Sequence, residues 1–126
     1  MRKRETRAGK EARHRFYEEV LSKGPCWFNS QMVDGNPCDG PMDPCHFLPK
    51  QRLKRIAKDR NYDERETLAM VWDSRNGVPG CRAHHHKVDN GFLRFTWDEL
   101  PIETHGFAFA WDLEWEVQQM FRKEYA

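Results

Sequence analysis

The chain has 126 residues, of which 33% are charged and 38% hydrophobic, and its formal net charge is +1. This length predicts a single domain, and so polar a composition predicts only a modest core. No apolar run approaches the roughly 18 residues of a membrane span, and none follows the basic first residues as it would in a secretory signal. The composition therefore excludes an integral membrane protein and disfavours export, so we expect a cytoplasmic protein.

Charge is distributed unevenly along the chain. Residues 1–15 carry seven Lys or Arg against two Glu, and residues 50–60 carry six against one Asp. Residues 92–126 are acidic, with three basic side chains against seven carboxylates. Clusters of Lys and Arg are typical of surfaces that bind nucleic acid, although two solvated helix faces would give the same pattern.

Apolar spacing and capping signals predict five helices. In chain order they cover residues 5–22, 50–60, 63–70, 82–90 and 108–123. The first is followed by a Gly-Pro pair, and the third opens with a capping box at residues 63–66. The fourth is ended by Gly91, and residues 73–77 between the third and fourth form a turn.

The last predicted helix has the clearest pattern, an apolar stripe at helical spacing. Its members are Ala110, Leu113, Val117, Met120 and Phe121. Trp111 and Trp115 lie one turn apart and off this stripe, where they could pack on the domain, form an oligomer contact or stack on bases. Phe107 and Phe109 are expected in the core.

Residues 25–49 are expected to be largely irregular. They contain five of the seven prolines and several turn dipeptides, with a ready turn at residues 34–37. Three of the four cysteines lie in this region, at positions 26, 38 and 45. In a reducing compartment such cysteines are more often metal ligands than disulfides, and without a metal the segment has little to hold it.

Cys26, Cys38, Cys81 and His84 form a candidate zinc set. The Cys81-Arg82-Ala83-His84 spacing lets the end of a strand and the first turn of a helix share one ion. Three thiolates and one imidazole suit tetrahedral Zn²⁺ in a closed structural site. The simpler alternative is that some of these residues are buried reduced cysteines.

Three further segments extend this pattern: Cys38-Asp39-Gly40, Cys45-His46-Phe47-Leu48-Pro49-Lys50, and the run from Arg75 to His85. In their order and spacing they resemble the HNH endonucleases, the ββα-metal finger nucleases, and in particular small phage-type members. The resemblance covers about residues 26–91 and implies a ββα-metal core with nuclease activity. It also implies a cytoplasmic site of action, in a host cell if the chain is phage-encoded.

The resemblance implies a role for each matching residue. His46 matches the general base that removes a proton from the attacking water, and Asn76 matches the residue that fixes the loop holding this base. His85 and Asp89 match the helix ligands of one catalytic divalent ion, Mg²⁺, Mn²⁺ or another transition metal. Three of these residues also have a plain structural alternative: His46 could be a buried core histidine, Asn76 part of an Asn-Gly turn, and Asp89 a carboxylate at a helix end. The resemblance gives His86 no role, and we expect its side chain to face solvent or to contact phosphate.

Cys45 departs from the family pattern, in which Asp or His often precedes the general base as a metal ligand. A thiolate is a poor ligand for Mg²⁺. Three interpretations remain: Cys45 replaces His84 at zinc, binds a transition metal in the active site, or is a spectator while Asp43 or Asp73 supplies an oxygen. We favour the spectator.

The expected fold is therefore α+β: a helix-rich single domain around a zinc-stapled ββα-metal finger. Residues 1–24 supply a basic N-terminal helix, residues 25–91 the zinc-bound core, and residues 92–126 an acidic amphipathic helical region.

The expected function is metal-dependent hydrolysis of DNA phosphodiester bonds with low sequence specificity, unless a phage or host protein partner supplies specificity. Six basic side chains are expected to contact the DNA backbone: Lys50, Arg52, Lys54, Arg55, Lys58 and Arg82. A non-catalytic zinc module that binds nucleic acid, or a ribonuclease with the same finger, would share much of this pattern. The oligomeric state is left open.

Overall fold

A computed structural model describes residues 4–30, 37–91 and 94–122 of the chain. Its elements in chain order are α1 (Arg7–Leu21), α2 (Trp27–Ser30), β1 (Met42–His46), α3 (Lys50–Asp59), α4 (Glu64–Val71), η1 (Ser74–Asn76), β2 (Gly77–Cys81), α5 (Arg82–Asp89), η2 (Trp97–Glu99), α6 (Ile102–Ala110) and α7 (Glu114–Met120). This confirms an α+β, helix-rich arrangement. Within the described residues, no helix is both long and apolar enough to cross a bilayer.

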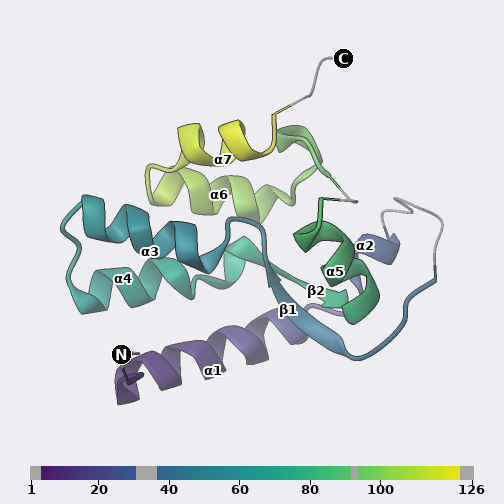
Figure 1. Cartoon of the computed structure of the whole chain (residues 1–126), viewed down its shortest axis with the longest axis horizontal. Helices are drawn as coiled ribbons and strands as arrows, with labels where there is room; N and C mark the ends of the chain where they lie inside the picture. Colours follow the sequence, from purple (N-terminus) through teal and green to yellow (C-terminus); the bar gives the residue numbers. More distant parts are fainter. Residues whose placement is uncertain (1–3, 31–36, 92–93, 123–126) are drawn as a thin grey trace.

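One antiparallel hairpin lies at the centre of the fold (Figure 1). β1 and β2 pair with Met42 opposite Cys81 and His46 opposite Gly77, while α3 and α4 are inserted between the two strands. α5 begins immediately after β2 and packs back against both strands. Residues 42–46, expected within a largely irregular region, therefore form a strand, because β2 satisfies their backbone hydrogen bonds.

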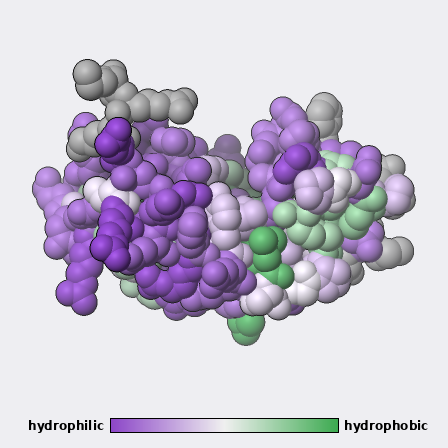
Figure 2. Space-filling view, turned by 90° about the horizontal axis from the view of Figure 1, so that it is seen from below, coloured by the Kyte–Doolittle hydropathy of each residue, from purple (hydrophilic) through white to green (hydrophobic). Residues whose placement is uncertain are grey.

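α1 covers the hairpin from the side opposite the C-terminal helices (Figure 1). Its N-cap is Thr6, whose side chain accepts the Gly9 N–H at 3.0 Å. Phe16 and Val20 are fully buried, and a Cβ at Gly77 would lie 2.7 Å from atoms of both side chains. The helix can approach the strand this closely only because Gly77 has no side chain. The opposite, outer face of α1 is mostly hydrophilic (Figure 2).

The middle helices agree with the sequence-based expectations. Asp63 and Glu66 form both hydrogen bonds of the predicted capping box at the start of α4. α5 ends as expected before Gly91, whose φ of 76° is a left-handed conformation that suits glycine. The predicted turn at residues 73–77 contains the short helix η1.

The single C-terminal helix predicted over residues 108–123 is wrong. α6 ends at Ala110 and α7 begins at Glu114, with Asp112 between them in a left-handed conformation at φ 54°. The Leu113 N–H donates to the Ala108 carbonyl at 2.8 Å, which closes a tight turn. The turn folds α7 back beside α6 (Figure 1), so that the buried side chains of both helices face one core.

This turn also changes which apolar residues are buried. Phe107 is in the core as expected, but Phe109 is 61% exposed, contrary to the expectation. Trp111 packs half-buried and donates its indole N–H to Asp73, whereas Trp115 is 68% exposed. An apolar pattern read along a single helix could not predict which of these side chains are buried, because the chain reverses direction between α6 and α7.

Some sequence-based expectations fall on residues 1–3, 31–36, 92–93 and 123–126. They include the first basic side chains of the N-terminal segment, most of the turn expected at residues 34–37, and the last residue of the helix expected over 108–123. These lie outside the described residues.

We predict that Gly80→Ala destabilises the domain by about 1–3 kcal/mol, because the new methyl group overpacks a closed space. A Cβ at Gly80 would lie 2.7 Å from both the Cys45 sulfur and the Phe28 ring. Gly106→Ala is the matched control, since a Cβ there meets nothing within 4 Å and a helix favours alanine. Chemical denaturation should show a loss only for Gly80→Ala; equal midpoints would contradict this packing.

Candidate functional site

The four residues of the candidate zinc set converge in the structure. Cys26 immediately precedes α2, Cys38 precedes β1, Cys81 ends β2 and His84 lies in the first turn of α5. The Nδ1 atom of His84 lies 3.5, 3.8 and 3.0 Å from the sulfurs of Cys26, Cys38 and Cys81, respectively. All four ligand atoms lie within 4.8 Å of one another. These distances fit ligands around one tetrahedral ion, so the set could hold a metal such as structural zinc.

The backbone around the cluster favours thiolates. The Cys81 sulfur accepts the His84 N–H at 3.4 Å, and the Cys26 sulfur accepts the Cys81 N–H at 3.3 Å. Burial raises the pKa of Cys81, but hydrogen bonds from the backbone N–H groups of His84 and Asp39 outweigh it and lower the pKa to about 7. Desolvation and the neighbouring thiols raise the pKa of Cys38 to about 12. A cation would remove this mutual repulsion and let the three thiolates coexist.

Cys45 is not part of this cluster. The group of converging ligands found among the described residues contains His84 and not Cys45. Cys45 is 3% exposed, and its sulfur lies 2.7 Å from the position that a Cβ on Gly80 would take. Burial raises the pKa of this thiol. Replacement of His84 by Cys45 at zinc is therefore contradicted, and the sulfur packs in the core.

His46 lies at the other end of the hairpin, held on three sides. Its ring stacks on Phe16 of α1, with centroids 4.3 Å apart, and meets the edge of Trp72 at 5.5 Å. Its Nε2 lies 2.9 Å from the Val71 carbonyl oxygen. Because a carbonyl only accepts hydrogen bonds, Nε2 carries the proton and Nδ1 keeps a lone pair.

Burial, with the positive charges of Lys50 and His85 nearby, lowers the pKa of His46 to about 4, although the bond to Val71 acts in the opposite direction. The imidazole is therefore neutral at pH 7, with Nδ1 able to accept a proton.

An open depression of about 410 Å³ brings His46 together with residues of α5. It is lined by Tyr17, Asp43, Pro44, His46, Pro49, Lys50, Trp72, His85 and Asp89. The Lys50 ammonium lies 5.6 Å from the centre of the Trp72 ring, which holds a positive charge at this wall. Three of the sequence-predicted residues, His46, His85 and Asp89, thus share one depression with Asp43.

The His85 ring lies between two carboxylates. Its Nδ1 is 3.1 Å from Asp43, and its Nε2 is 3.4 Å from Asp89. Burial acts to raise the pKa of Asp43, but Arg82, at 3.1 Å, and His85 hold that pKa below its usual value. The donor chemistry suits a hard or borderline divalent ion. Since the two ring nitrogens point in opposite directions, one ion held by all three residues requires a turn of the ring or of one carboxylate.

Asn76 is fully buried and ties two segments together. Its side-chain oxygen accepts the Leu48 N–H at 2.9 Å, and its amide donates to the Leu48 carbonyl at 3.0 Å. Its own carbonyl accepts the Phe47 N–H. These bonds fix the loop that directly follows His46, whereas an ordinary Asn-Gly turn would leave the side chain in solvent. A role in catalysis stays a prediction.

Several contributors to this site carry no recognisable sequence signal. Phe16, Trp72 and the Val71 carbonyl hold His46, but the chain places them 25–30 residues away from it. Asp73, considered above as an oxygen ligand, instead binds Arg75 and Trp111 and does not line the depression. Asp43 alone of the two candidate carboxylates reaches His85.

The predicted basic residues fall into two groups on α3 and one separate residue on α5. Lys54 and Lys58 are exposed on α3 and follow Lys50 at four-residue spacing, so the three share a face that begins at the depression. Arg52 and Arg55 are also exposed but line a groove beside Trp115 of α7. Arg82 differs from the others because it pairs with Asp43.

We predict that alanine variants of the three adjacent histidines differ in whether they lose bound zinc and stability. His84 is buried among the sulfurs, His85 faces the two carboxylates, and His86 is exposed. His84→Ala should lose bound zinc and, with it, several kcal/mol of stability, whereas His85→Ala and His86→Ala should keep both. Metal analysis and thermal melts with and without a strong chelator test this. Zinc loss in His85→Ala, with zinc retained in His84→Ala, would reverse the assignment.

We also predict a specific acid sensitivity. The pKa of His46 is lowered to about 4 in the fold, from 6.5. The unfolded chain therefore binds a proton between these values that the folded chain does not, so stability falls as pH falls through this window. Relative to His46→Gln, the wild type should lose about 2 kcal/mol of unfolding free energy between pH 7 and pH 5.

Denaturation with saturating zinc at both pH values measures this difference, because the zinc ligands are common to both proteins. His86→Gln, which changes an exposed histidine, should follow the wild type. A wild-type-like pH dependence in His46→Gln would show that His46 titrates normally.

No protein-family model matches this chain, and comparisons with curated proteins and with solved structures likewise give no match. Its function must therefore be argued from the chemistry of the site itself.

Proposed function

We propose that the protein is a metal-dependent nuclease of the HNH type that hydrolyses DNA phosphodiester bonds. The observation that carries this proposal is the state of His46: its Nε2–H is bound to the Val71 carbonyl, which leaves a neutral Nδ1 on a ring that lines the same depression as the His85 and Asp43 pair. A neutral imidazole nitrogen that carries a lone pair can accept a proton from water, although a pKa of about 4 makes it a weak base. A module that only binds nucleic acid has no need of it.

Each residue of the depression has a proposed part. His46 takes the proton of the attacking water, and Asn76 positions His46 through the loop at Leu48. His85, with the carboxylates of Asp43 and Asp89, would hold the divalent ion. When bound there, the ion supplies stabilisation of the charge that develops on the phosphate and on the leaving oxygen. Lys50 at the rim attracts the backbone phosphate.

The substrate is proposed from charge and position. Lys50, Lys54 and Lys58 form a row that leads away from the depression along α3 and can attract the phosphates of a duplex. Side chains that contact phosphate give affinity without reading sequence. We therefore assign low sequence specificity, unless a protein partner supplies it. The four free cysteines suit a reducing compartment, which favours action in the cytoplasm.

The test is cleavage of supercoiled plasmid with Mg²⁺, Mn²⁺, Ni²⁺ or Zn²⁺ by the zinc-loaded protein. His46→Gln should lose about 10²- to 10⁴-fold in rate while it keeps zinc, fold and DNA affinity. The Gln amide keeps a donor for the Val71 carbonyl and removes the basic nitrogen, but it also removes the ring that stacks on Phe16, so the fold is measured alongside the rate. His86→Gln is the matched control and should cleave normally.

Two results would redirect the proposal. DNA binding without cleavage by the wild type under every metal condition would favour the non-catalytic zinc module. Cleavage of labelled RNA, but not of plasmid, would favour a ribonuclease with the same finger.

A further inference from the structure

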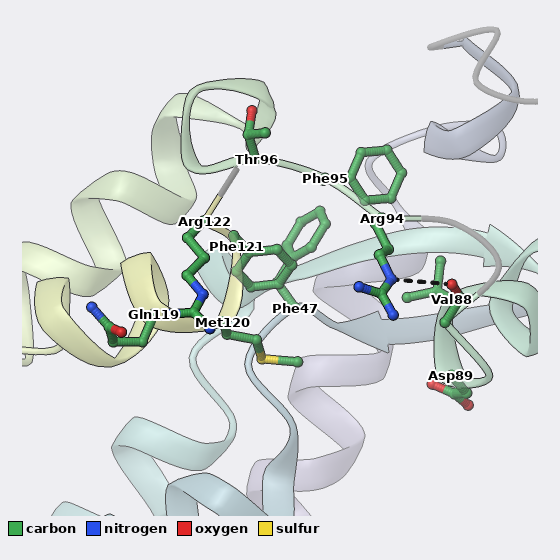
Figure 3. A pocket seen from close by; sticks show the side chains of 11 residues that line it. Phe47, Val88, Asp89, Arg94, Phe95, Thr96, Gln119, Met120, Phe121 and Arg122 are labelled. Atoms are coloured by element: carbon green, nitrogen blue, oxygen red, sulfur yellow. Dashed lines mark hydrogen bonds between the residues drawn. The ribbon is translucent and has the colours of Figure 1, made fainter. Parts of the chain in front are cut away.

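Figure 3 shows the residues that line a second cavity, of about 480 Å³. It opens between the end of α5, the segment at residues 94–96 and the end of α7. Phe47, the residue directly after His46, lies in its wall, and Asp89 lines both this cavity and the depression. A ligand in this cavity would therefore lie beside the candidate catalytic residues.

The walls of this cavity are aromatic and held in place. Phe47, Phe95 and Phe121 line it, and each is at most 7% exposed. The Phe47 and Phe121 rings meet edge to face at 6.2 Å. The Trp97 N–H donates to the Phe121 carbonyl at 2.7 Å, which fixes the chain after α7 against the segment after α5. The three rings thus form a fixed floor of the cavity, although only a small part of each ring is open to a ligand.

The rim of the cavity is cationic. The side chains of Arg94 and Arg122 reach it from opposite sides (Figure 3). The Nε of Arg94 donates to the Gly91 carbonyl at 3.3 Å, which keeps its guanidinium near the mouth. Gln119 and Thr96 add polar groups that can bind the edge of a ring. Asp89 adds one carboxylate, so the two arginines leave the lining with a net positive charge, and a ligand with a flat ring and an anionic group complements the rings and the arginines.

We propose that this cavity binds one nucleobase of the substrate strand, with the adjoining phosphate at the Arg122 side of the rim. A base can lie against the exposed parts of aromatic side chains whatever its identity, and guanidinium groups bind phosphate. Cavities of about 300–1,000 Å³ hold small molecules, so the space suits one nucleotide. An apolar peptide side chain would leave the arginines unused, and a bare phosphate would leave the rings unused.

This inference rests on the proposed function and adds a feature to it. A base enters the cavity only if it leaves its duplex stack or comes from an unpaired strand. The geometry therefore points to a substrate in which the nucleotide beside the scissile phosphate is unstacked. Cleavage next to mismatches, loops or single-stranded ends should be preferred over cleavage of uniform duplex.

The test is equilibrium binding of dAMP and of deoxyribose 5-phosphate to the zinc-loaded protein without other divalent ions, followed by NMR. The nucleotide should bind about tenfold or more tightly than the sugar phosphate, since stacking of one base contributes roughly 1–3 kcal/mol. Gln119→Trp should abolish this preference by filling the mouth. Gln118→Trp is the matched control, because this neighbour is exposed on the same helix and does not line the cavity.

The outcomes separate this inference from the proposed function. Cleavage by the wild type, together with equal affinity for dAMP and the sugar phosphate, would overturn the base site and leave the nuclease standing. A preference for dAMP that Gln119→Trp removes would support the site even if no DNA is cleaved. A preference that survives in Gln119→Trp but fails in Gln118→Trp would place the nucleotide elsewhere and overturn the assignment.

Discussion

The pairing of β1 with β2 is the constraint on which both candidate sites depend. Its register sets His46 opposite Gly77 and Cys81 opposite Met42, so the imidazole and the sulfur cluster lie at opposite ends of one short hairpin. α5 starts at the sulfur end with His84 and packs back along the strands, which brings His85 and Asp89 to the depression beside His46. A slip of one residue would turn every side chain of a strand to its other face, so neither site would survive it.

A hairpin of two strands is marginal by itself, and the rest of the chain stabilises it from both sides. On one side, α1 brings Phe16 and Val20 against Gly77, and the same Phe16 ring supports His46. On the other side, Phe28 of α2 packs against Gly80, and the N–H groups of Arg82 and Ala83 donate to the carbonyls of Pro41 and Asp39. A metal in the sulfur cluster would add a cross-link between these segments, as expected for a small domain with a modest core.

The sulfur cluster and the cluster of His85 with its two carboxylates differ in burial, which suits the first to a structural role and the second to binding a substrate. Three sulfurs and one nitrogen converge and are mostly buried, so an ion among them has no open position and supports structure. His85 and its two carboxylates line an open depression together with a neutral histidine and a lysine, where water and an anionic substrate can enter. The Asn76 side chain supports the depression alone, since it anchors the loop after His46 from within the turn that leads into β2.

The sequence by itself determined the features that depend on neighbours along the chain. The capping box at Asp63, the end of α5 before Gly91 and the close spacing of Cys81 and His84 are local patterns, and the structure contains all three. The grouping of the two N-terminal cysteines with this pair also came from the sequence, because so few residue types can hold a metal.

Only the tertiary structure decided the features that depend on distant contacts. Periodicity predicts a helix through residues 108–123, but burial of Leu113 and Val117 against the same core as Phe107 requires the turn at Asp112 and leaves Phe109 in solvent. The choice of Asp43 over Asp73 as the partner of His85, and the proton on His46 Nε2, depend on contacts between residues 25–42 positions apart. Such contacts leave no local pattern, since they are set by the packing of the helices around the hairpin.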